Sequence, residues 1–245
     1  MNSGERDPGT VSIAPTAETA PARRLTVLIS GRGSNLKALI DACAAGRVRG
    51  RVTAVISNRP QAPGLEFARQ AQVPWAVIDH RDFRDRRDFD RELARAVEDS
   101  APDLIVLAGF MRVLTEEFTN RFRGRMVNIH PSLLPDLRGL DTHAKALASG
   151  LSTHGASVHF VTSELDGGPV IMQARVPVCP DDTPETLEAR VHTVEHRLYP
   201  AAVALICSGR IQAAGDKVLL DGRPMDRPLL LEDIPEATRR CAGSR

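Results

Sequence analysis

Short runs of aliphatic and β-branched residues alternate with amphipathic stretches through the first half of the chain. Runs of this length, bounded by turn residues, are typical of buried strands, and the stretches between them are long enough for helices. This alternation predicts a parallel sheet covered by helices. The predicted strands are 25–30, 51–57, 76–79, 104–107 and 126–129.

Two of the connecting stretches carry a helical period. In each of them apolar residues recur at intervals of three and four, which marks the buried face of a helix. The first stripe begins just after Ser34 and consists of Leu36, Leu39, Ile40 and Cys43. The second consists of Phe89, Leu93 and Val97. The Arg and Asp residues interleaved over 81–95 are assigned to the solvated face of the second helix.

The pattern changes in the second half of the chain. Two strand-like runs, 154–161 and 170–178, are joined by a loop that contains two adjacent glycines, and they predict an antiparallel addition to the sheet. Pro184 then opens a long helix, and Asp221-Gly222 is a hairpin turn signal. The predicted fold class is therefore α/β, a Rossmann-like, mostly parallel sheet flanked by helices, with an antiparallel addition in the C-terminal half.

By length alone, the chain could hold one large domain or two small ones. The chain has 245 residues, and 42% of them are hydrophobic, which is enough to form a core. Residues 1–22 are rich in Pro, Ala, Thr, Ser and Gly, and we expect a disordered N-terminal extension there. We expect a single domain over 23–231 and a loose C-terminal tail over 232–245.

Composition also narrows the class of partner. Lys and Arg number 32 against 31 Asp and Glu, so a net charge of +1 provides no general field for nucleic acid or an anionic membrane. No apolar stretch is long enough for a membrane span or an export signal. The four cysteines are widely separated, without a C-x-x-C pair. We therefore expect reduced thiols and a cytoplasmic protein that acts on small molecules.

A glycine-rich segment, Gly31-Arg32-Gly33-Ser34-Asn35, joins the first predicted strand to the first predicted helix. A loop in this position presents free N–H groups and the positive end of the helix dipole to an anion. A tight turn alone can also demand glycine, so that alternative stays open. A dinucleotide site is disfavoured because Leu36 replaces the third glycine of the fingerprint and Ser57-Asn58 replaces its acid. One phosphate fits the loop better than two.

The candidate catalytic residues are an amide, an imidazole and a carboxylate. Asn128 and His130 are two apart at the end of a predicted strand, so both side chains leave the same face. Asp166 lies in the glycine-containing loop, which would have to fold back over that strand end. Such a trio suits a tetrahedral intermediate, with Asn128 donating to the oxyanion, His130 moving protons or supporting charge, and Asp166 favouring the charged imidazole. No cysteine or Gly-x-Ser-x-Gly elbow adjoins them, which favours direct transfer over an acyl-enzyme.

His192 and His196 are four apart with Glu195 between them, which raises the question of a metal site. Their order, H-T-V-E-H, is not that of a zinc protease, and no third ligand is evident in the sequence. We therefore predict no metal and assign these histidines to a helix face packed near the site.

With these residues assembled, the chain resembles the phosphoribosylglycinamide formyltransferase family over 25–227. The resemblance rests on five segments that occur in the family's order. They are VLISGRGSNL at 27–36, LAGFMR at 107–112, NIHPSLLP at 128–135, HGASVH at 154–159 and DGGP at 166–169.

The resemblance implies a formyltransferase fold, 10-formyltetrahydrofolate as co-substrate, no metal, and a monomer or homodimer. It implies that the catalytic residues are Asn128, His130 and Asp166. The residues implied to bind glycinamide ribonucleotide are Gly33, Ser34, Asn35 and Glu195. The residues implied to line the folate pocket are Arg86, Met111, Arg112, Val113, Leu114, Asn128, Thr162 and Asp166.

One loop departs from the family pattern and two alternatives stay open. After Pro135 the family has an aromatic-Pro-Gly segment followed by His or a similar residue, whereas this chain has Asp136-Leu137-Arg138-Gly139-Leu140-Asp141. Arg138 and Asp141 could pair with each other or with substrate. Another folate-dependent formyl-handling enzyme, such as a formyltetrahydrofolate hydrolase or another formyltransferase, shares the trio. A non-catalytic nucleotide-binding module would keep only the glycine loop.

Overall fold

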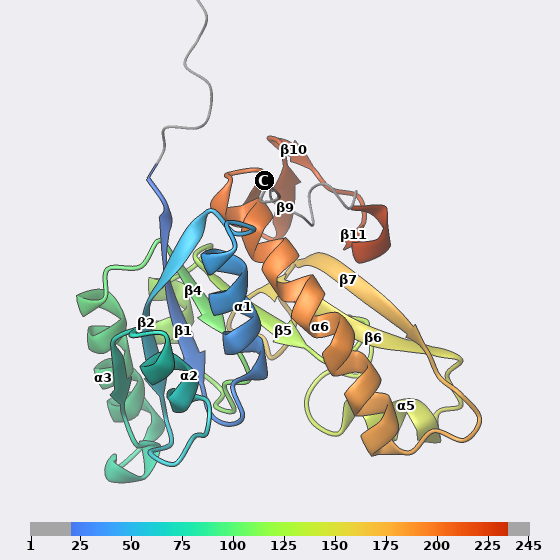
Figure 1. Cartoon of the computed structure of the whole chain (residues 1–245), viewed down its shortest axis with the longest axis horizontal. Helices are drawn as coiled ribbons and strands as arrows, with labels where there is room; N and C mark the ends of the chain where they lie inside the picture. The colour runs from blue at the N-terminus through green and yellow to red at the C-terminus, as the bar shows by residue number, and fades with distance from the viewer. Residues whose placement is uncertain (1–20, 235–245) are drawn as a thin grey trace, which may run out of the picture.

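A computed structural model describes residues 21–234 of the chain. It contains an eight-stranded sheet in the order β11-β7-β6-β5-β4-β1-β2-β3 (Figure 1). Pairing is parallel from β3 through β2, β1 and β4 to β5, and antiparallel from β5 through β6 to β7. The strands are β1 Arg23–Ile29, β2 Gly50–Ser57, β3 Trp75–Val77, β4 Leu104–Leu107, β5 Met126–His130, β6 Thr153–Phe160, β7 Val170–Pro177 and β11 Leu229–Leu230.

Helices cover both faces of this sheet because successive strand residues point to opposite sides. Val27 of β1 belongs to the core shared with α1, α2, α5 and α6, whereas Leu28 belongs to the core shared with α3 and α4. The helices are α1 Ser34–Ala44, α2 Leu65–Gln70, α3 Arg86–Asp99, α4 Glu116–Arg121, α5 Thr142–Ala148 and α6 Pro184–Cys207. The predicted α/β class, with a parallel sheet and an antiparallel addition, is confirmed.

The last part of the described chain forms a second, antiparallel sheet in the order β10-β9-β8. Its strands are β8 Ile211–Ala214, β9 Lys217–Leu220 and β10 Arg223–Pro224. Asp221 and Gly222 connect β9 to β10 with φ values of 50° and 79°, which confirms the predicted hairpin turn.

The C-terminal prediction needs a correction. Residues Leu231–Asp233 form a 3-10 turn, and Leu231 and Ile234 are buried within the larger core. The predicted start of the loose tail, residue 232, is therefore placed too early in the chain, because these two apolar side chains are buried against the sheet. The remainder of that tail, 235–245, and residues 1–20 of the expected extension lie outside the described residues.

Helix α6 connects the two halves of the sheet. Thr183 caps its first turn, accepting from the Thr186 N–H while the Thr186 side chain accepts from the Thr183 N–H. Farther along, the fully buried Tyr199 hydroxyl lies 2.9 Å from the Leu107 carbonyl oxygen and 3.1 Å from that of Val127. The helix is thus bonded to both β4 and β5. No helix within 21–234 combines the length and hydropathy needed to cross a membrane.

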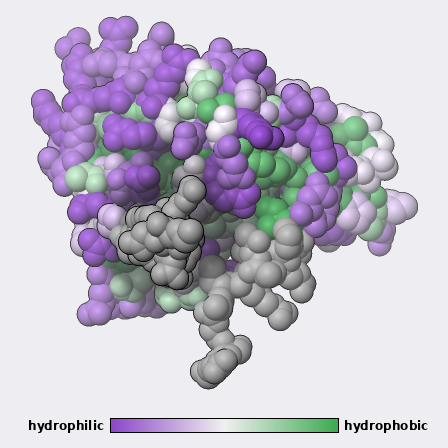
Figure 2. All heavy atoms as spheres, turned by 90° about the horizontal axis from the view of Figure 1, so that it is seen from above, coloured by the Kyte–Doolittle hydropathy of each residue, from purple (hydrophilic) through white to green (hydrophobic). Residues whose placement is uncertain are grey.

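The carboxyl ends of β1, β4 and β5 meet at one edge of the sheet because these strands are parallel. In Figure 1 this edge is at the bottom of the view. Figure 2 looks onto the opposite side, where hydrophilic residues make up most of the surface not covered by grey atoms. Open α/β sheets bind ligands at the carboxyl edge.

Candidate active site

Asn128, His130 and Asp166 come together at this edge. Asn128 and His130 end β5, and the antiparallel register places His159 and Ser157 of β6 opposite them. Asp166 lies in the loop between β6 and β7 and has a φ of 49°. The predicted return of this loop over the strand end is observed, since the Asp166 carboxylate lies 3.4 Å from Nδ1 of His130.

Both ring nitrogens of His130 face oxygen acceptors. Nδ1 faces Asp166, and Nε2 lies 2.9 Å from the Leu137 carbonyl oxygen. A carbonyl can only accept, so Nε2 carries a hydrogen in this arrangement, and a carboxylate beside Nδ1 favours a hydrogen there as well. Both nitrogens donate only in the imidazolium form. The surroundings of this buried side chain, which is 5% exposed, therefore suit the charged ring.

His159 orients the amide of Asn128. Its Nδ1 donates to the Phe160 carbonyl oxygen at 2.9 Å, so Nε2 is left as the acceptor of the neutral ring. Burial lowers the pKa of His159 to about 4, which keeps the ring neutral at pH 7. The Asn128 Nδ2 lies 3.2 Å from this Nε2 and donates to it. One amide hydrogen is thereby committed, and the second remains available to a substrate oxygen.

A buried polar network holds the turn that follows His130. The Ser157 hydroxyl donates to the Ser132 carbonyl at 2.6 Å and accepts from the Leu134 N–H at 2.9 Å. Gln173 of β7 donates to the Leu134 carbonyl and to Ser157, both at 2.9 Å. These bonds connect the turn to two neighbouring strands, so the position of His130 depends on the antiparallel half of the sheet.

The divergent loop at 136–141 lies against the trio. The Gly139 N–H donates to Asp166 at 3.0 Å, and the Leu137 carbonyl is the acceptor for His130. Arg138 pairs with Glu164, so of the two open alternatives the Arg138–Asp141 pair is not observed among the described residues. The reason is geometric, because Asp141 is already the residue before α5, with a φ of 59°.

The glycine loop and Glu195 form a second cluster at the same edge. Gly33 precedes α1 with a φ of 72°, and a Cβ there would lie 2.5 Å from the Cα of Gly64. The tight-turn explanation for this glycine is therefore met, whereas the anion site stays a prediction. Asn35 donates through Nδ2 to Glu195 at 2.9 Å, while its Oδ1 is buried and has no hydrogen-bond partner among the described residues. Burial raises the pKa of Glu195 to about 7.

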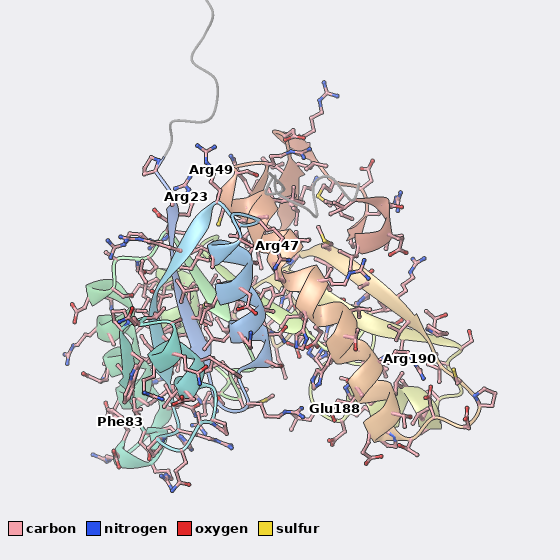
Figure 3. All side chains as sticks on the ribbon, in the orientation of Figure 1. Arg23, Arg47, Arg49, Phe83, Glu188 and Arg190 are labelled. Carbon is pink, nitrogen blue, oxygen red and sulfur yellow. The ribbon has the colours of Figure 1, made fainter. Side chains whose placement is uncertain are left out.

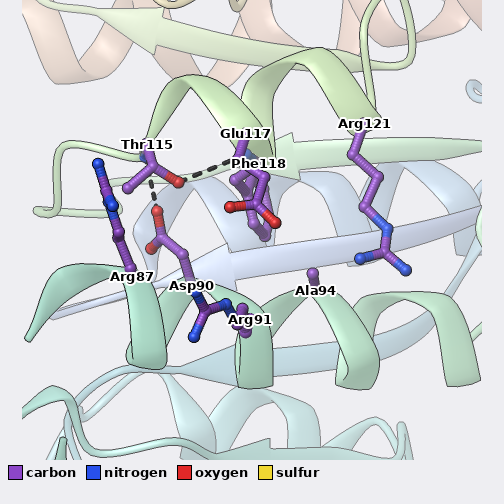
Figure 4. A pocket seen from close by; sticks show the side chains of 8 residues that line it. All are labelled: Arg87, Asp90, Arg91, Ala94, Thr115, Glu117, Phe118 and Arg121. Carbon is purple, nitrogen blue, oxygen red and sulfur yellow. Dashed lines mark hydrogen bonds between the residues drawn. The ribbon is translucent and has the colours of Figure 1, made fainter.

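The segment Met111, Arg112, Val113 and Leu114 is held at both ends. The Met111 N–H donates to the Ser30 hydroxyl at 2.7 Å, and the N–H of Thr115, the next residue, donates to Asp90 at 2.6 Å. Figure 4 shows the latter contact within a small depression between α3 and α4. Met111 and Val113 remain 62% and 47% exposed between these anchors.

The other expected folate residues are placed less directly. Arg86 opens α3, and both it and Arg112 act electrostatically on the buried Asp90 carboxyl, which relates Arg86 to the segment after β4. Thr162 follows β6, and its hydroxyl lies 3.5 Å from the Glu164 carbonyl oxygen. No direct contact joins either residue to the catalytic trio among those recorded for 21–234.

The histidines weighed as a metal site stack on each other. The rings of His192 and His196 are 6.4 Å apart and nearly parallel, with an interplanar angle of 12°. Within the described part of the chain, no group of three or more His, Cys, Asp or Glu side chains is placed to hold a metal ion.

Sequence reasoning missed three contributors, namely His159, Ser157 and the Leu137 carbonyl. Ser157 and His159 are two apart in β6, which is a signal that their side chains share one face. Their partners become apparent only from the register with β5. The carbonyl carries no sequence signal because every residue has one.

Comparison with known proteins connects this geometry to one family. Residues 23–203 match the formyl transferase family. The chain is 49% identical to the phosphoribosylglycinamide formyltransferase of Escherichia coli (strain K12) over 199 residues, which is 81% of this chain and 94% of that protein.

Solved structures agree. The phosphoribosylglycinamide formyltransferase of Coxiella burnetii superimposes with a TM-score of 0.82 at 47% identity, covering 86% of this chain and 99% of that one. Glycinamide ribonucleotide transformylase 1 of Symbiobacterium toebii gives a TM-score of 0.79 at 44% identity, with 81% and 93% covered.

Proposed function

The chain belongs to the formyl transferase family, and we propose that it transfers a formyl group from 10-formyltetrahydrofolate to the amine of glycinamide ribonucleotide in purine biosynthesis. The observation that carries this proposal is the pairing of the Asn128, His130 and Asp166 cluster with a glycine loop at the same sheet edge. The first cluster suits formyl transfer, and the second suits a phosphorylated acceptor.

The chemistry follows from the groups around His130. The substrate amine attacks the formyl carbon, a new C–N bond forms, and the carbonyl oxygen becomes an oxyanion. The free amide hydrogen of Asn128 and the imidazolium of His130 stabilise that oxyanion, and Asp166 balances the charge of the ring. The bond to the folate nitrogen then breaks, and that nitrogen receives the proton lost by the amine. Tetrahydrofolate and the formylated ribonucleotide leave.

A covalent intermediate on Cys43 or Cys207 is disfavoured. Burial raises the pKa of Cys43 to about 11 and that of Cys207 to about 12, so neither supplies a thiolate at pH 7. Neither belongs to the cluster at the end of β5. Direct transfer between the two bound substrates is the mechanism that the described residues support.

Exposed apolar side chains support a folate site beside the trio. Four of the six exposed large hydrophobic residues in 21–234 are on loops that carry or adjoin site residues, namely Met111, Val113, Leu140 and Leu165. A flat heterocycle binds apolar surface with a few polar groups to orient it. We assign folate contacts to Arg86, Met111, Arg112, Val113, Leu114, Asn128, Thr162 and Asp166.

The ribonucleotide is assigned to the glycine loop. The first N–H groups of a helix have no intrahelical partner, and those of Ser34 and Asn35 are placed to meet a phosphate. Gly33 leaves no side chain in the way. Glu195, protonated or ionised near pH 7, offers both donor and acceptor character to ribose hydroxyls. We place the reaction in the cytoplasm and expect a monomer or homodimer.

The competing function is hydrolysis of the same folate, in which water replaces the amine. One assay separates the two reactions: release of tetrahydrofolate is followed with and without glycinamide ribonucleotide. Dependence on the ribonucleotide, with loss of turnover in His130→Ala, is expected. Release at the same rate without the ribonucleotide would assign the chain to the hydrolases.

A further inference from the structure

Two side-chain contacts connect the glycine loop to α6. Arg32 donates to Glu188 at 2.5 Å, and Asn35 donates to Glu195 at 2.9 Å. Figure 3 shows Glu188 on the N-terminal half of α6, near the carboxyl edge of the sheet. Glu188 and Glu195 are two helical turns apart, so both face the loop from one side of the helix.

His192 lies between these two contacts. Its Nε2 is 3.7 Å from Oε1 of Glu188 and 4.0 Å from Oε2 of Glu195. The imidazole therefore lies beside both carboxylates that contact the loop. The Glu188 carboxylate is shared by a guanidinium at 2.5 Å and an imidazole at 3.7 Å.

The charges around His192 come from three elements. Burial lowers the pKa of His192, and Arg32 in the loop and His196 on α6 lower it further, whereas Glu188 raises it. His143 on α5 interacts electrostatically with both His192 and Glu188. Glu195 completes the set, with a pKa near 7. At neutral pH the ring is neutral, and Arg32 supplies the positive charge that balances Glu188.

A second observation indicates that a ligand enters here. Asn35 is 8% exposed, and its buried Oδ1 has no hydrogen-bond partner among the described residues. It lies in the first turn of an 11-residue helix, where N–H groups also lack partners. Buried polar atoms are normally satisfied, and an amide oxygen can only accept, so this one marks a place that a ligand group with a hydrogen to donate completes, such as a hydroxyl of the phosphorylated substrate.

We propose that Glu188 is a built-in counter-anion of the phosphate subsite, holding Arg32 in the free enzyme and releasing it to the phosphate of the substrate. His192 then takes up one proton from solvent, because it is left between the Glu188 carboxylate and a dianion. The inference rests on the proposed function, since it assumes that a phosphate binds at the glycine loop. It adds Arg32 and His192 as side-chain ligands, selective for a doubly charged group.

The test uses inorganic sulfate, a dianion that does not titrate near neutral pH. Its binding is measured by calorimetry at pH 7.5 in two buffers of different ionisation enthalpy, which reports protons taken up. Wild type should take up a measurable fraction of a proton, and His192→Gln should take up less, because only the part contributed by Glu195 remains. Ring-proton NMR, assigned with the same variant, should show the pKa of His192 rising by about one unit or more with sulfate.

Glu188→Gln tests the counter-anion itself. Freed from its carboxylate, Arg32 should bind sulfate about two- to fivefold more tightly, the range expected from one exposed ion pair. The control is Glu92→Gln on α3, which removes a carboxylate from an exposed pair with Arg95 at 3.2 Å and should leave sulfate affinity unchanged. Thermal unfolding of each variant checks that the fold is retained.

The outcomes separate this inference from the proposed function. Absence of sulfate binding, sulfate affinity in Glu188→Gln no higher than wild type, or proton uptake in His192→Gln equal to that of wild type would each overturn the inference. Normal formylation of glycinamide ribonucleotide alongside any of these results would leave the function standing. Sulfate behaviour as expected, with no formylation of the ribonucleotide, would keep the subsite and remove the function.

Discussion

The two ends of the site both bury titratable side chains, an acid at one end and bases at the other. At the glycine-loop end the buried titratable group is an acid, Glu195, whose pKa burial raises to about 7. At the catalytic end the fully buried groups are bases, His154 and His159, whose pKa values burial lowers to about 4. Burial disfavours the charged form in both cases, so the neutral form of all three side chains is favoured.

His130 differs from these groups because its nitrogens face Asp166 and the Leu137 carbonyl. Two acceptors provide for the imidazolium what water would otherwise supply. The comparison shows that His130 differs from the two neutral histidines in the acceptors beside its ring and not in its burial. The following experiments test this difference between the two ends.

The largest effect is expected at the catalytic end. His130→Ala should lower kcat by about 10² to 10⁴, because the reaction loses a charged group beside the oxyanion that can also move a proton. Ribonucleotide affinity should hardly change, because the phosphate is bound at the other end. Steady-state kinetics with equilibrium binding of the ribonucleotide checks both statements. Turnover near that of wild type would remove His130 from the mechanism.

Asn128→Ala should lower kcat by roughly 10² to 10³, because one donor to the oxyanion is lost. The donor acts mainly in the transition state, so KM should change much less than kcat. A loss found only in KM would show that the amide merely positions substrate.

The glycine-loop end should lose binding rather than turnover. Gly33→Ala introduces a Cβ 2.5 Å from the Cα of Gly64 at a φ of 72°, which strains the loop and should lower ribonucleotide affinity about tenfold or more. Folate affinity, measured by titration, should survive. Gly31→Ala is the matched control, because nothing lies within 4 Å of its added Cβ. Equal loss of both ligands in Gly33→Ala would indicate collapse of the first turn.

Stability should depend on pH in opposite senses at the two ends. His154 has a lowered pKa in the folded state, so the unfolded chain binds more protons and stability falls as pH drops from 6.5 to about 4. Glu195 has a raised pKa, so its contribution falls as pH rises from 4.5 to about 7. Each is worth at most about 3 kcal/mol at one pKa unit per 1.36 kcal/mol.

Denaturant unfolding of two variants checks these senses. The quantity compared is the free energy of unfolding of each variant minus that of wild type. This difference should be more favourable at pH 8 than at pH 5 for Glu195→Gln, and more favourable at pH 5 than at pH 8 for His154→Gln. Parallel profiles for the two variants would contradict the assignment of buried, neutral groups.

The smallest effect is expected in the divergent loop. Arg138 pairs with Glu164, but their side chains are 38% and 64% exposed, and exposed pairs contribute about 1 kcal/mol or less. Arg138→Ala should therefore change kcat and KM by less than about fivefold. A larger loss of folate affinity alone would show that the pair shapes the folate pocket.

The same comparison explains what the sequence could predict. The first strand, glycine loop and α1 are contiguous, and their glycines, apolar period and polar loop residues all lie within one short segment. Asn128 and His130 could be related to each other by their spacing. The role of His159 could not be derived in the same way, because it depends on the pairing of β5 with β6 and on a register shift at His159 between β6 and β7.

The limits elsewhere have similar physical causes. The sequence shows a glycine at 168 in the returning loop but not why glycine is needed there. The reason is that a Cβ at this position would collide with the Phe160 carbonyl oxygen. The burial of Leu231 and Ile234 depends on a sheet formed by residues more than fifty positions earlier. Local sequence patterns predict helices and strands, whereas contacts between distant segments decide whether a segment near the end of the chain is buried.

The hydroxyl of Tyr199 fixes the position of α6 relative to the sheet. That helix carries Glu195 beside the glycine loop, and Tyr199 joins it to the strands that end at the catalytic edge. With the phosphate at the glycine loop, as proposed, one helix and the sheet beneath it would set the span between the phosphate and Asn128. We therefore expect a phosphorylated amine of another length to occupy one end only, so that the acceptor is selected by its length as well as by its charge.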